Sequence, residues 1–424
     1  MQTLLNSSIK NTPKHLWLGV LICTVAGLFY CYEFVLRIIP GVLQTEISAA
    51  FGHISATEFG QLSAFYYFAY SPMQMPVGIL MDRVGPRCLL TAACFCCTIG
   101  SFLFMDTNSL IIASIGRFMI GFGSSFAFVG VLFLAMKWVP RQFFSLVVGL
   151  VTTLGMLGVV YGEMKITSMT MHFGWLKVLN CMVMIGIILS FFIGLIIRDA
   201  PDKGVVIKQS MHKFFAQVLK VLISPQVWLI GAVGAFLYTS LSVFGELWGK
   251  TYLEQAHHLT KIQAAQSISA LFLGWAAGAP LAGYFSDWTG RRVLPLVIGA
   301  IGAFICISIV LYHPGLSYNV LNILLFLYGV FSGTEIIVFI MGKENSGAEL
   351  SGTVFAAINM IVTLGGVILQ PLVGKLLDVF GHSVVIDDAR IYSLISYQCA
   401  LSVLPISLVA VLILSFFMHD HASK

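Results

Sequence analysis

Long apolar runs, broken by short polar segments, make up most of this 424-residue chain. A helix needs roughly 20 predominantly apolar residues to cross the hydrocarbon core of a bilayer. Read at that length, the runs predict an all-α membrane protein with twelve spanning helices. We place these spans at residues 15–40, 58–81, 88–105, 109–137, 142–166, 174–197, 225–250, 262–285, 293–312, 318–341, 351–376 and 391–417.

The longest polar stretch separates six predicted spans from the other six. It divides the chain into a first six-helix bundle at 1–197, a cytoplasmic central loop at 198–224 and a second six-helix bundle at 225–424. Within the loop, apolar residues recur at helical spacing from Met211 to Ile223, with lysines between them. This pattern favours an amphipathic helix on the membrane surface, although a plain basic linker would carry the same charges.

Composition supports a membrane location for nearly the whole chain. Hydrophobic residues make up 58%, charged residues 10%, and mean hydropathy is +0.94. A soluble domain carries about 25% charged residues, so the apolar excess must face lipid. We therefore expect the lipid bilayer as the main partner, no nucleic-acid partner, and a monomer.

The basic residues are unevenly distributed between the two predicted sides. With the N-terminus placed inside, the cytoplasmic ends and loops hold fifteen Lys and Arg, and the opposite side holds six. Arg37 and Arg117 remain within the membrane. Because positive charges gather on the cytoplasmic side, both termini are predicted to be cytoplasmic. An even number of spans requires the termini to share a side.

A charged turn occurs twice, between spans two and three and between spans eight and nine. Both copies read G-x-x-x-D-x-x-G-x-R, and each holds one further arginine. A motif repeated at equivalent places in two hydrophobic halves indicates a membrane protein built by duplication. The residues concerned are Gly78, Asp82, Arg83, Gly85 and Arg87 in the first copy, and Gly283, Asp287, Gly290, Arg291 and Arg292 in the second.

With its six plus six spans and repeated turn, the chain resembles the major facilitator superfamily of secondary transporters. Span four adds a second signature, because Gly116-Arg117 followed by Gly121 and Gly123 is similar to the superfamily pattern R-x-x-x-G-x-G. The resemblance implies two pseudo-symmetric six-helix bundles that face each other across a central cavity. It also implies transport of a small molecule by alternating access.

The resemblance also implies a gating role for the two turns. In the family, the turn aspartate caps the N-terminus of a helix in the opposite bundle, where free N–H groups and the helix dipole favour an anion. Asp82 should then meet the start of span eleven near Ser351, and Asp287 the start of span five near Gln142. These contacts require a closed inner side. Placement of positive charge inside is a simpler role for the same arginines.

Charged residues inside the membrane are the candidate binding groups, because each costs on the order of 2.5–3.5 kcal/mol to insert. Glu33 and Arg37 share one face of span one, and Arg117 lies in span four. We expect Arg117 to hold a substrate carboxylate, or to pair with Glu33 when the cavity is empty. Glu33 is the leading proton-coupling site, since burial makes a carboxyl group switchable, and Glu335 is the second. A permanent structural ion pair with Arg117 or Arg37 is the alternative for Glu33.

Other polar residues have weaker signals. Tyr66, Tyr70 and Gln74 fall on one face of span two and suit either a small polar ligand or hydrogen bonds between helices. Glu163, Glu246 and Lys250 fall near predicted span ends and are expected to be solvated. The chain shows no catalytic motif, no metal-ligand spacing and no cofactor motif. We therefore expect neither an enzyme nor a bound cofactor or metal.

Within the superfamily, segments around Glu33, Tyr66, Arg117 and Gly155 resemble proteobacterial intraphagosomal nutrient transporters and, more distantly, lysosomal dipeptide carriers. This resemblance implies proton-coupled uptake of an amino acid, short peptide or nucleoside across a bacterial inner membrane. A siderophore or carboxylate transporter and an exporter of lipophilic compounds are the alternatives.

Overall fold

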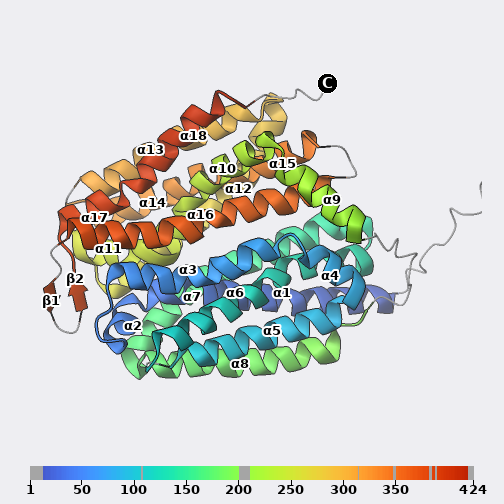
Figure 1. Cartoon of the computed structure of the whole chain (residues 1–424), viewed down its shortest axis with the longest axis horizontal. Helices are drawn as coiled ribbons and strands as arrows, with labels where there is room; N and C mark the ends of the chain where they lie inside the picture. Colours follow the sequence, from blue (N-terminus) through green and yellow to red (C-terminus); the bar gives the residue numbers. More distant parts are fainter. Residues whose placement is uncertain are drawn as a thin grey trace, which may run out of the picture.

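A computed structural model describes residues 13–106, 108–199, 211–313, 315–346, 350–381, 384–386 and 389–418. The first helices form one bundle (Figure 1), and their bounds are α1 (Pro13–Val42), α2 (Gln44–Ala50), α3 (Ala56–Met73), α4 (Val77–Val84), α5 (Pro86–Phe104), α6 (Leu110–Trp138), α7 (Arg141–Phe173) and α8 (Trp175–Ile196). The short helix α9 (Met211–Leu222) follows.

The remaining elements form a second bundle beside the first (Figure 1). They are α10 (Pro225–Thr239), the π-helix η1 (Ser240–Trp248), α11 (Gly249–Ala256), α12 (Lys261–Thr289), α13 (Val293–Tyr312), α14 (Tyr318–Ser332), the 3₁₀ segment η2 (Gly333–Ile336), α15 (Ile337–Glu344), α16 (Ser351–Phe380), the strands β1 (Val384–Ile386) and β2 (Ala389–Ile391), α17 (Leu394–Leu401) and α18 (Val403–Ser415).

The predicted all-helical membrane architecture is confirmed, with local differences. Within the described ranges, eleven helical segments are long and apolar enough to cross a membrane. The second predicted span is instead divided into α3 and α4, because Pro72 and Pro76 remove backbone donors around the break. The antiparallel pair β1–β2, with Val384 opposite Ile391, was not predicted, and the last span begins at Leu394 rather than at 391.

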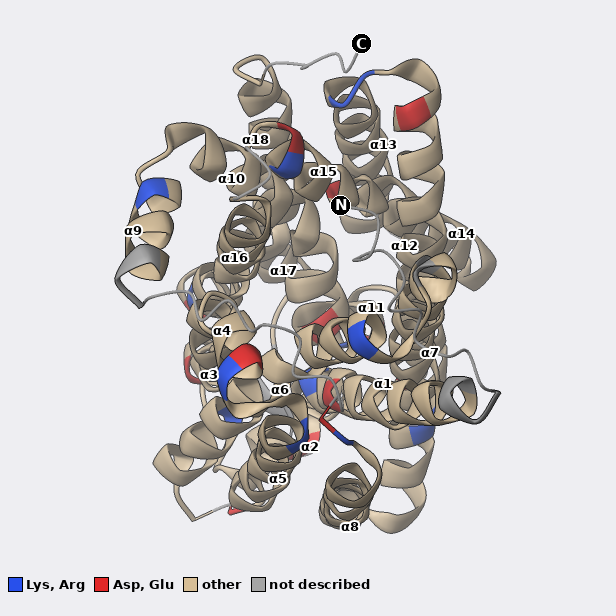
Figure 2. Cartoon of the chain, turned by 90° about the vertical axis from the view of Figure 1, so that its right-hand side faces the viewer, with Lys and Arg blue, Asp and Glu red and all other residues tan. Residues whose placement is uncertain are grey.

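Two ends of the molecule can be distinguished along its long axis. The hairpin end holds α2, α11, α17 and the β1–β2 pair, and the α9 end holds α4, α9 and α15 (Figure 1). The start of α1 and the end of α18 also lie at the α9 end. Seen from the α9 end, Lys and Arg (blue) and Asp and Glu (red) occupy only short stretches of the helices, and the rest of each helix is uncharged (Figure 2).

The most extensive packing between the bundles, among the described residues, involves three pairs of elements. α3 packs against α16, α7 packs against α12, and α1 packs against η1. Large apolar side chains on the outside are exposed, as expected for surfaces that meet lipid, among them Phe68, Phe102, Ile111, Phe191, Leu281 and Ile406.

Candidate functional site

A buried ion pair on α1 forms the centre of the site. The Arg37 Nη2 atom lies 3.1 Å from Glu33 Oε2 and 3.2 Å from Oε1, one helical turn away. Tyr66 of α3 donates its hydroxyl to Glu33 Oε2 at 2.9 Å and accepts from Arg37 Nε at 2.9 Å. Of the pairings predicted for Glu33, the structure therefore shows the one with Arg37.

Arg117 of α6 is buried beside this pair, but its polar atoms are only partly used. Its Nη1 donates to the backbone carbonyl of Leu36 at 3.0 Å, and its guanidinium carbon lies 5.1 Å from the centre of the Tyr66 ring. The side chain is 2% exposed, and its Nε has no hydrogen-bond partner within the described structure. Buried guanidinium groups are normally paired, so this one has capacity for an anion.

Glycines position Arg117 by letting α6 approach its neighbours. A methyl group at Gly116 would collide with the backbone of Gly100 on α5, and one at Gly121 would collide with the backbone of Tyr66. Small residues permit such close helix packing in membrane proteins. The glycine signature around Arg117 therefore brings this arginine against Tyr66 and α1.

Glu246 is a further candidate residue, and it is buried although its position near a predicted span end indicated a solvated side chain. It lies in η1, is 2% exposed, and accepts hydrogen bonds from Tyr67 at 2.5 Å and from Tyr238 at 3.4 Å. Tyr67 belongs to the first bundle, and Arg37 of that bundle donates to the Tyr238 hydroxyl at 3.2 Å. The network thus joins the two bundles, and Glu246 enters it from a π-helix, a distortion frequent at functional sites.

Tyr70 and Gln74 extend the same face of α3 away from this network. Tyr70 stacks on Tyr66 with ring centres 5.5 Å apart, and its ring lies 4.9 Å from the guanidinium carbon of Arg37. Gln74 donates to the Tyr70 carbonyl at 3.4 Å and accepts from Asn359 of α16 at 2.9 Å. The predicted stripe therefore exists, and its last member makes a contact between bundles.

Glu335 lies apart from the ion pair, in the 3₁₀ segment that interrupts the tenth span. Its side chain is 3% exposed, and it has no side-chain hydrogen bond or ion pair with any described residue. A buried carboxyl group without a partner is costly when charged. Its chemistry therefore differs from that of Glu33, which Arg37 and Tyr66 satisfy.

The repeated turns lie at the α9 end. Gly85 and Gly290 have positive φ values of 93° and 64°, which side-chain-bearing residues rarely adopt. Arg292 lies 2.6 Å from Asp287 and 2.7 Å from Glu344. Hydrogen bonding to Glu344, then to Asp287, holds the pKa of the Arg292 guanidinium above its ordinary value.

The other arginines of the turns lie on the surface. Arg83 and Arg291 are exposed, and Arg87 donates to the Gly194 carbonyl of its own bundle at 2.8 Å. A methyl group added at Gly78 or Gly283 would meet nothing within 4 Å. Between described residues, neither turn aspartate bonds to the opposite bundle.

An aspartate that the sequence analysis did not single out connects the bundles at the hairpin end. Asp378 of α16 accepts from the backbone N–H of Ala56 at 3.1 Å and of Thr57 at 2.8 Å, at the start of α3. The Thr57 and Tyr392 hydroxyls also donate to it, at 2.5 Å and 2.6 Å. Ser55 caps the next free N–H, that of Glu58. Asp378 therefore caps a helix of the opposite bundle, where the helix dipole favours an anion.

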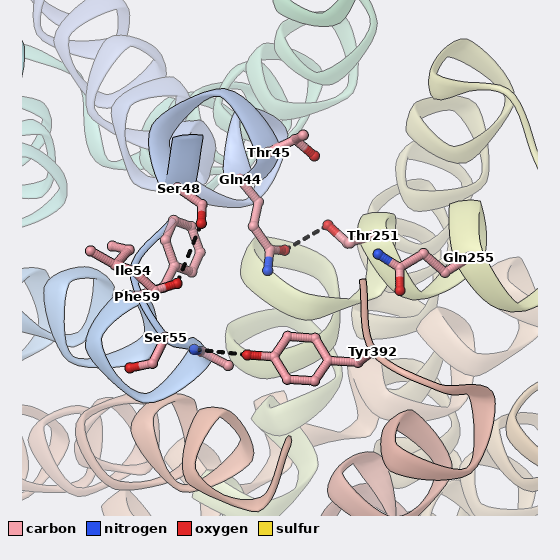
Figure 3. Close-up of a pocket in the computed structure, with 10 residues that line it drawn as sticks. Gln44, Thr45, Ser48, Ile54, Ser55, Phe59, Thr251, Gln255 and Tyr392 are labelled. Carbon is pink, nitrogen blue, oxygen red and sulfur yellow. Dashed lines mark hydrogen bonds between the residues drawn. The ribbon is translucent and has the colours of Figure 1, made fainter. Parts of the chain in front are cut away.

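Further polar contacts close the hairpin end around Asp378. Lys250 donates to the Val42 carbonyl at 2.7 Å and to Thr167 at 2.9 Å, both in the first bundle. Thr251 donates to Gln44 at 2.6 Å beside a small pocket (Figure 3). In the same pocket, the backbone N–H of Ala56, which follows Ser55, donates to the hydroxyl of Tyr392. Lys261 and Glu46 form an ion pair at 2.7 Å.

The prediction that Glu163, Glu246 and Lys250 are solvated was wrong. Their side chains belong to residues that are 1%, 2% and 5% exposed, and one carboxylate oxygen of Glu163 has no partner among the described residues. Helix α7 continues to Phe173, and the helical segment that holds Glu246 continues to Ala256. The charges are therefore covered by the opposite bundle rather than placed at helix ends.

Comparison with protein families gives one broad match. The model of the family described as Major Facilitator Superfamily matches residues 22–370. The matched range runs from within α1 to within α16. It therefore includes the central network, by which we mean Glu33, Arg37, Tyr66, Tyr67, Arg117, Tyr238 and Glu246.

Individual relatives are distant but match most of this chain. The lysosomal dipeptide transporter MFSD1 of Danio rerio is 23% identical, over 87% of this chain and 83% of the relative. The membrane sensor protein UhpC of Escherichia coli (strain K12) is 22% identical, over 80% and 82%. A crystal structure of a bacterial homologue of the human lysosomal transporter Spinster, inward-facing and unoccupied, superposes with a TM-score of 0.73 at 16% identity, covering 94% of this chain and 95% of that one.

Proposed function

This chain belongs to the major facilitator superfamily and is a membrane transporter, and we propose that it takes up a small polar nutrient together with protons by alternating access. The cargo is an amino acid, a short peptide or a nucleoside. The observation that carries the proposal is Arg117, a buried guanidinium whose Nε has no partner within the described structure. A substrate carboxylate would supply that partner through a charge-assisted hydrogen bond.

Arg37, Glu33 and the Tyr66–Tyr70–Gln74 stripe complete the substrate site in this proposal. Arg37 is held in a fixed position at the interface by Glu33 and Tyr66. Tyr70 and Gln74 line the same face of α3 toward the α9 end. These groups suit a polar cargo better than a lipophilic one, because each needs a hydrogen-bonding partner when buried.

Proton coupling is assigned to Glu33 and Glu335. Glu335 is buried without a side-chain partner among the described residues, an arrangement that favours its protonated form. Glu33 exchanges protons only if Arg37 releases it, for example when substrate engages Arg37. We expect Glu33→Gln to abolish proton-driven accumulation while sparing substrate exchange, measured as uptake into proteoliposomes with and without a pH gradient. A wild-type response to the gradient in that variant would move the coupling site to Glu335.

In this proposal the α9 end faces the cytoplasm of a bacterial inner membrane and holds both termini. The hairpin end, closed by Asp378 and Lys250, is then the outer gate. Closure of the inner gate would bring Asp82 to the start of α16 and Asp287 to the start of α7. The neighbouring glycines would allow the helices to approach closely, and the arginines of the turns would lie beside the two acids. The transporter would work as a monomer, because each chain contains both bundles.

Transport of a polycarboxylate such as a siderophore is the second candidate, since the free Nε of Arg117 would also serve a ligand with several carboxylates. Export of lipophilic compounds predicts binding that does not depend on Arg117.

A thermal-shift screen of the purified protein separates these possibilities. Amino acids, dipeptides, nucleosides, polycarboxylate siderophores and lipophilic cations are tested on wild type, Arg117→Ala and the control Lys177→Ala, which removes an exposed charge from the same bundle. A ligand at about 100 times its Kd stabilises by roughly 2.7 kcal/mol. We expect a carboxylate-bearing nutrient to stabilise wild type and Lys177→Ala but not Arg117→Ala. Stabilisation by lipophilic cations alone, in all three proteins, would contradict the proposal.

A further inference from the structure

The central network contains two carboxylates and two guanidinium groups, and they are not used equally. Glu33 and Arg37 form an ion pair on α1. Arg117 and Glu246 form no ion pair with any residue that the structure describes. Arg117 has one backbone hydrogen bond, and Glu246 has two phenol donors. One cation and one anion therefore remain without a charged partner.

These two groups come from opposite bundles and face the same small region. Arg117 lies against the ring of Tyr66, and Glu246 accepts from Tyr67, the next residue of α3. The rings of Tyr66 and Tyr67 lie 5.2 Å apart, and no hydrogen bond or ion pair joins Arg117 to Glu246 among the described residues. A molecule placed between them would need a negative group on the side of Arg117 and a positive group on the side of Glu246.

The carboxylate of Glu246 has unused hydrogen-bonding capacity for a further donor. A carboxylate accepts about four hydrogen bonds, and the contact from Tyr238 to Oε1 is long at 3.4 Å. The other charged neighbours of the network are Glu33 and Arg37, which neutralise each other. An ammonium group offers three donors and a full positive charge, so it matches what Glu246 lacks.

We propose that Glu246 binds the ammonium group of the transported molecule while Arg117 binds its carboxylate. The inference rests on the proposed function and narrows its cargo to zwitterions, namely amino acids or short peptides with a free amino terminus. Nucleosides and polycarboxylates lack the ammonium group and fall outside this class.

Contact with both groups also gives the cargo a mechanical role. Because Arg117 belongs to α6 and Glu246 to η1, one zwitterion would connect the two bundles at the level of the interface. An ammonium donor would replace or share the phenol donors of Glu246, one of which comes from the first bundle. Substrate binding would therefore change the contact between α3 and η1 directly.

The experiment uses the purified full-length protein and matched ligand pairs. The probes are the common amino acids and L-alanyl-L-alanine, each compared with its N-acetyl derivative, together with a nucleoside, a tricarboxylate and a lipophilic cation. Dissociation constants are measured by titration on wild type, Glu246→Gln and the control Glu163→Gln. The control removes a buried carboxylate near the hairpin end, and Gln at 246 keeps an acceptor for Tyr67 and Tyr238.

We expect at least one zwitterion to bind, and its N-acetyl derivative to bind at least about tenfold more weakly, the size of one lost charge-assisted hydrogen bond. Glu246→Gln should weaken the zwitterion by a similar factor and leave the N-acetyl derivative unchanged, because that ligand never used the carboxylate. Glu163→Gln should bind both as wild type does. If Glu246→Gln does not fold, the wild-type comparison of free and acetylated ligands still decides.

Three results would overturn the inference. Equal weakening of both ligands by Glu246→Gln would show a general structural role. Binding of the nucleoside or tricarboxylate without any zwitterion would exclude the ammonium site while leaving uptake of a polar nutrient intact. Binding of the lipophilic cation alone, or of no probe, would count against the proposed function as well.

Discussion

The two ends of the second and eleventh spans differ in how much space surrounds their glycines. Near the hairpin end, a methyl group at Gly60 would collide with the backbone of Gln370, and one at Gly374 would collide with that of Ala56. Toward the α9 end, methyl groups at Gly78 and Gly352 would meet nothing within 4 Å. The glycines near the hairpin end are thus needed for helix packing, whereas Gly78 of α4 and Gly352 of α16 border open space.

Polar contacts follow the same division. At the hairpin end Asp378, Lys250 and Lys261 all reach the first bundle. At the α9 end, Asp287 instead bonds to Arg292 of its own turn. In this structure, an acid caps a helix of the opposite bundle at the hairpin end. The α9 end holds acids suited to the same contact, but they are not engaged across the described interface.

The largest expected effect comes from removing the hairpin-end cap by Asp378→Asn. This change takes a carboxylate away from two backbone N–H groups and two hydroxyls, and should destabilise the closed hairpin end by about 3 kcal/mol. The hydrogen-exchange rate at the Ala56 and Thr57 amides should therefore rise about a hundredfold.

The control for this change is Glu58→Gln, which alters the cap within α3 without touching the opposite bundle. It should leave the bundle contact intact. Equal exchange in wild type and Asp378→Asn would show that the cap does not hold the two bundles together.

A smaller effect is expected when a methyl group is added on the tight side of the comparison. Gly374→Ala introduces a collision with the Ala56 backbone and should lower the stability of the closed hairpin end by about 1–3 kcal/mol. Gly352→Ala adds the same group to the same helix, in open space, and should change stability by less than about 0.5 kcal/mol. Thermal unfolding of both variants measures the difference. Indistinguishable melting temperatures would contradict the expectation that helix packing at Gly374 stabilises the closed hairpin end.

The smallest effect on this structure is expected for Asp82→Asn. Asp82 is exposed and bonds to no residue of the opposite bundle in the described structure, so thermal stability should change by less than about 0.5 kcal/mol. Transport should nevertheless slow, because the proposed inner gate would lose its acid, while substrate affinity stays close to wild type. Proteoliposome uptake at wild-type speed would argue against any gating role of this turn.

Sequence reasoning located the parts whose signal is local. The apolar runs identified the spans, and the repeated turns required glycine where Gly85 and Gly290 have positive φ. Burial of Glu33, Arg37 and Arg117 followed from their position inside apolar runs. The pairing of Glu33 stayed open. Helical spacing places Arg37 near Glu33, but the sequence does not show whether span four packs close enough for Arg117 to reach Glu33.

Residues covered by the opposite bundle were beyond that reasoning. Hydropathy ends the seventh span at residue 250, whereas its helical segment continues to Ala256, so Glu246 lies ten residues before the end. Asp378 lies just after the predicted span 351–376 without a motif that marks it, although it caps α3. The available signals were the Ser55–Glu58 capping box, which marks a helix start with further free N–H groups, and the clustered tyrosines of α3.

Hydrogen exchange at the starts of α3 and α16 would show whether the bundles close at one end when they open at the other. Peptides covering residues 55–60 of α3 and 351–357 of α16 are followed by mass spectrometry in wild type, Asp378→Asn and Asp82→Asn. If the bundles exchange one capped helix start for the other, Asp378→Asn should raise exchange at the α3 start and lower it at the α16 start, and Asp82→Asn should do the reverse. Parallel changes at both starts, or a change only at the mutated end, would contradict an exchange of contacts between the two ends.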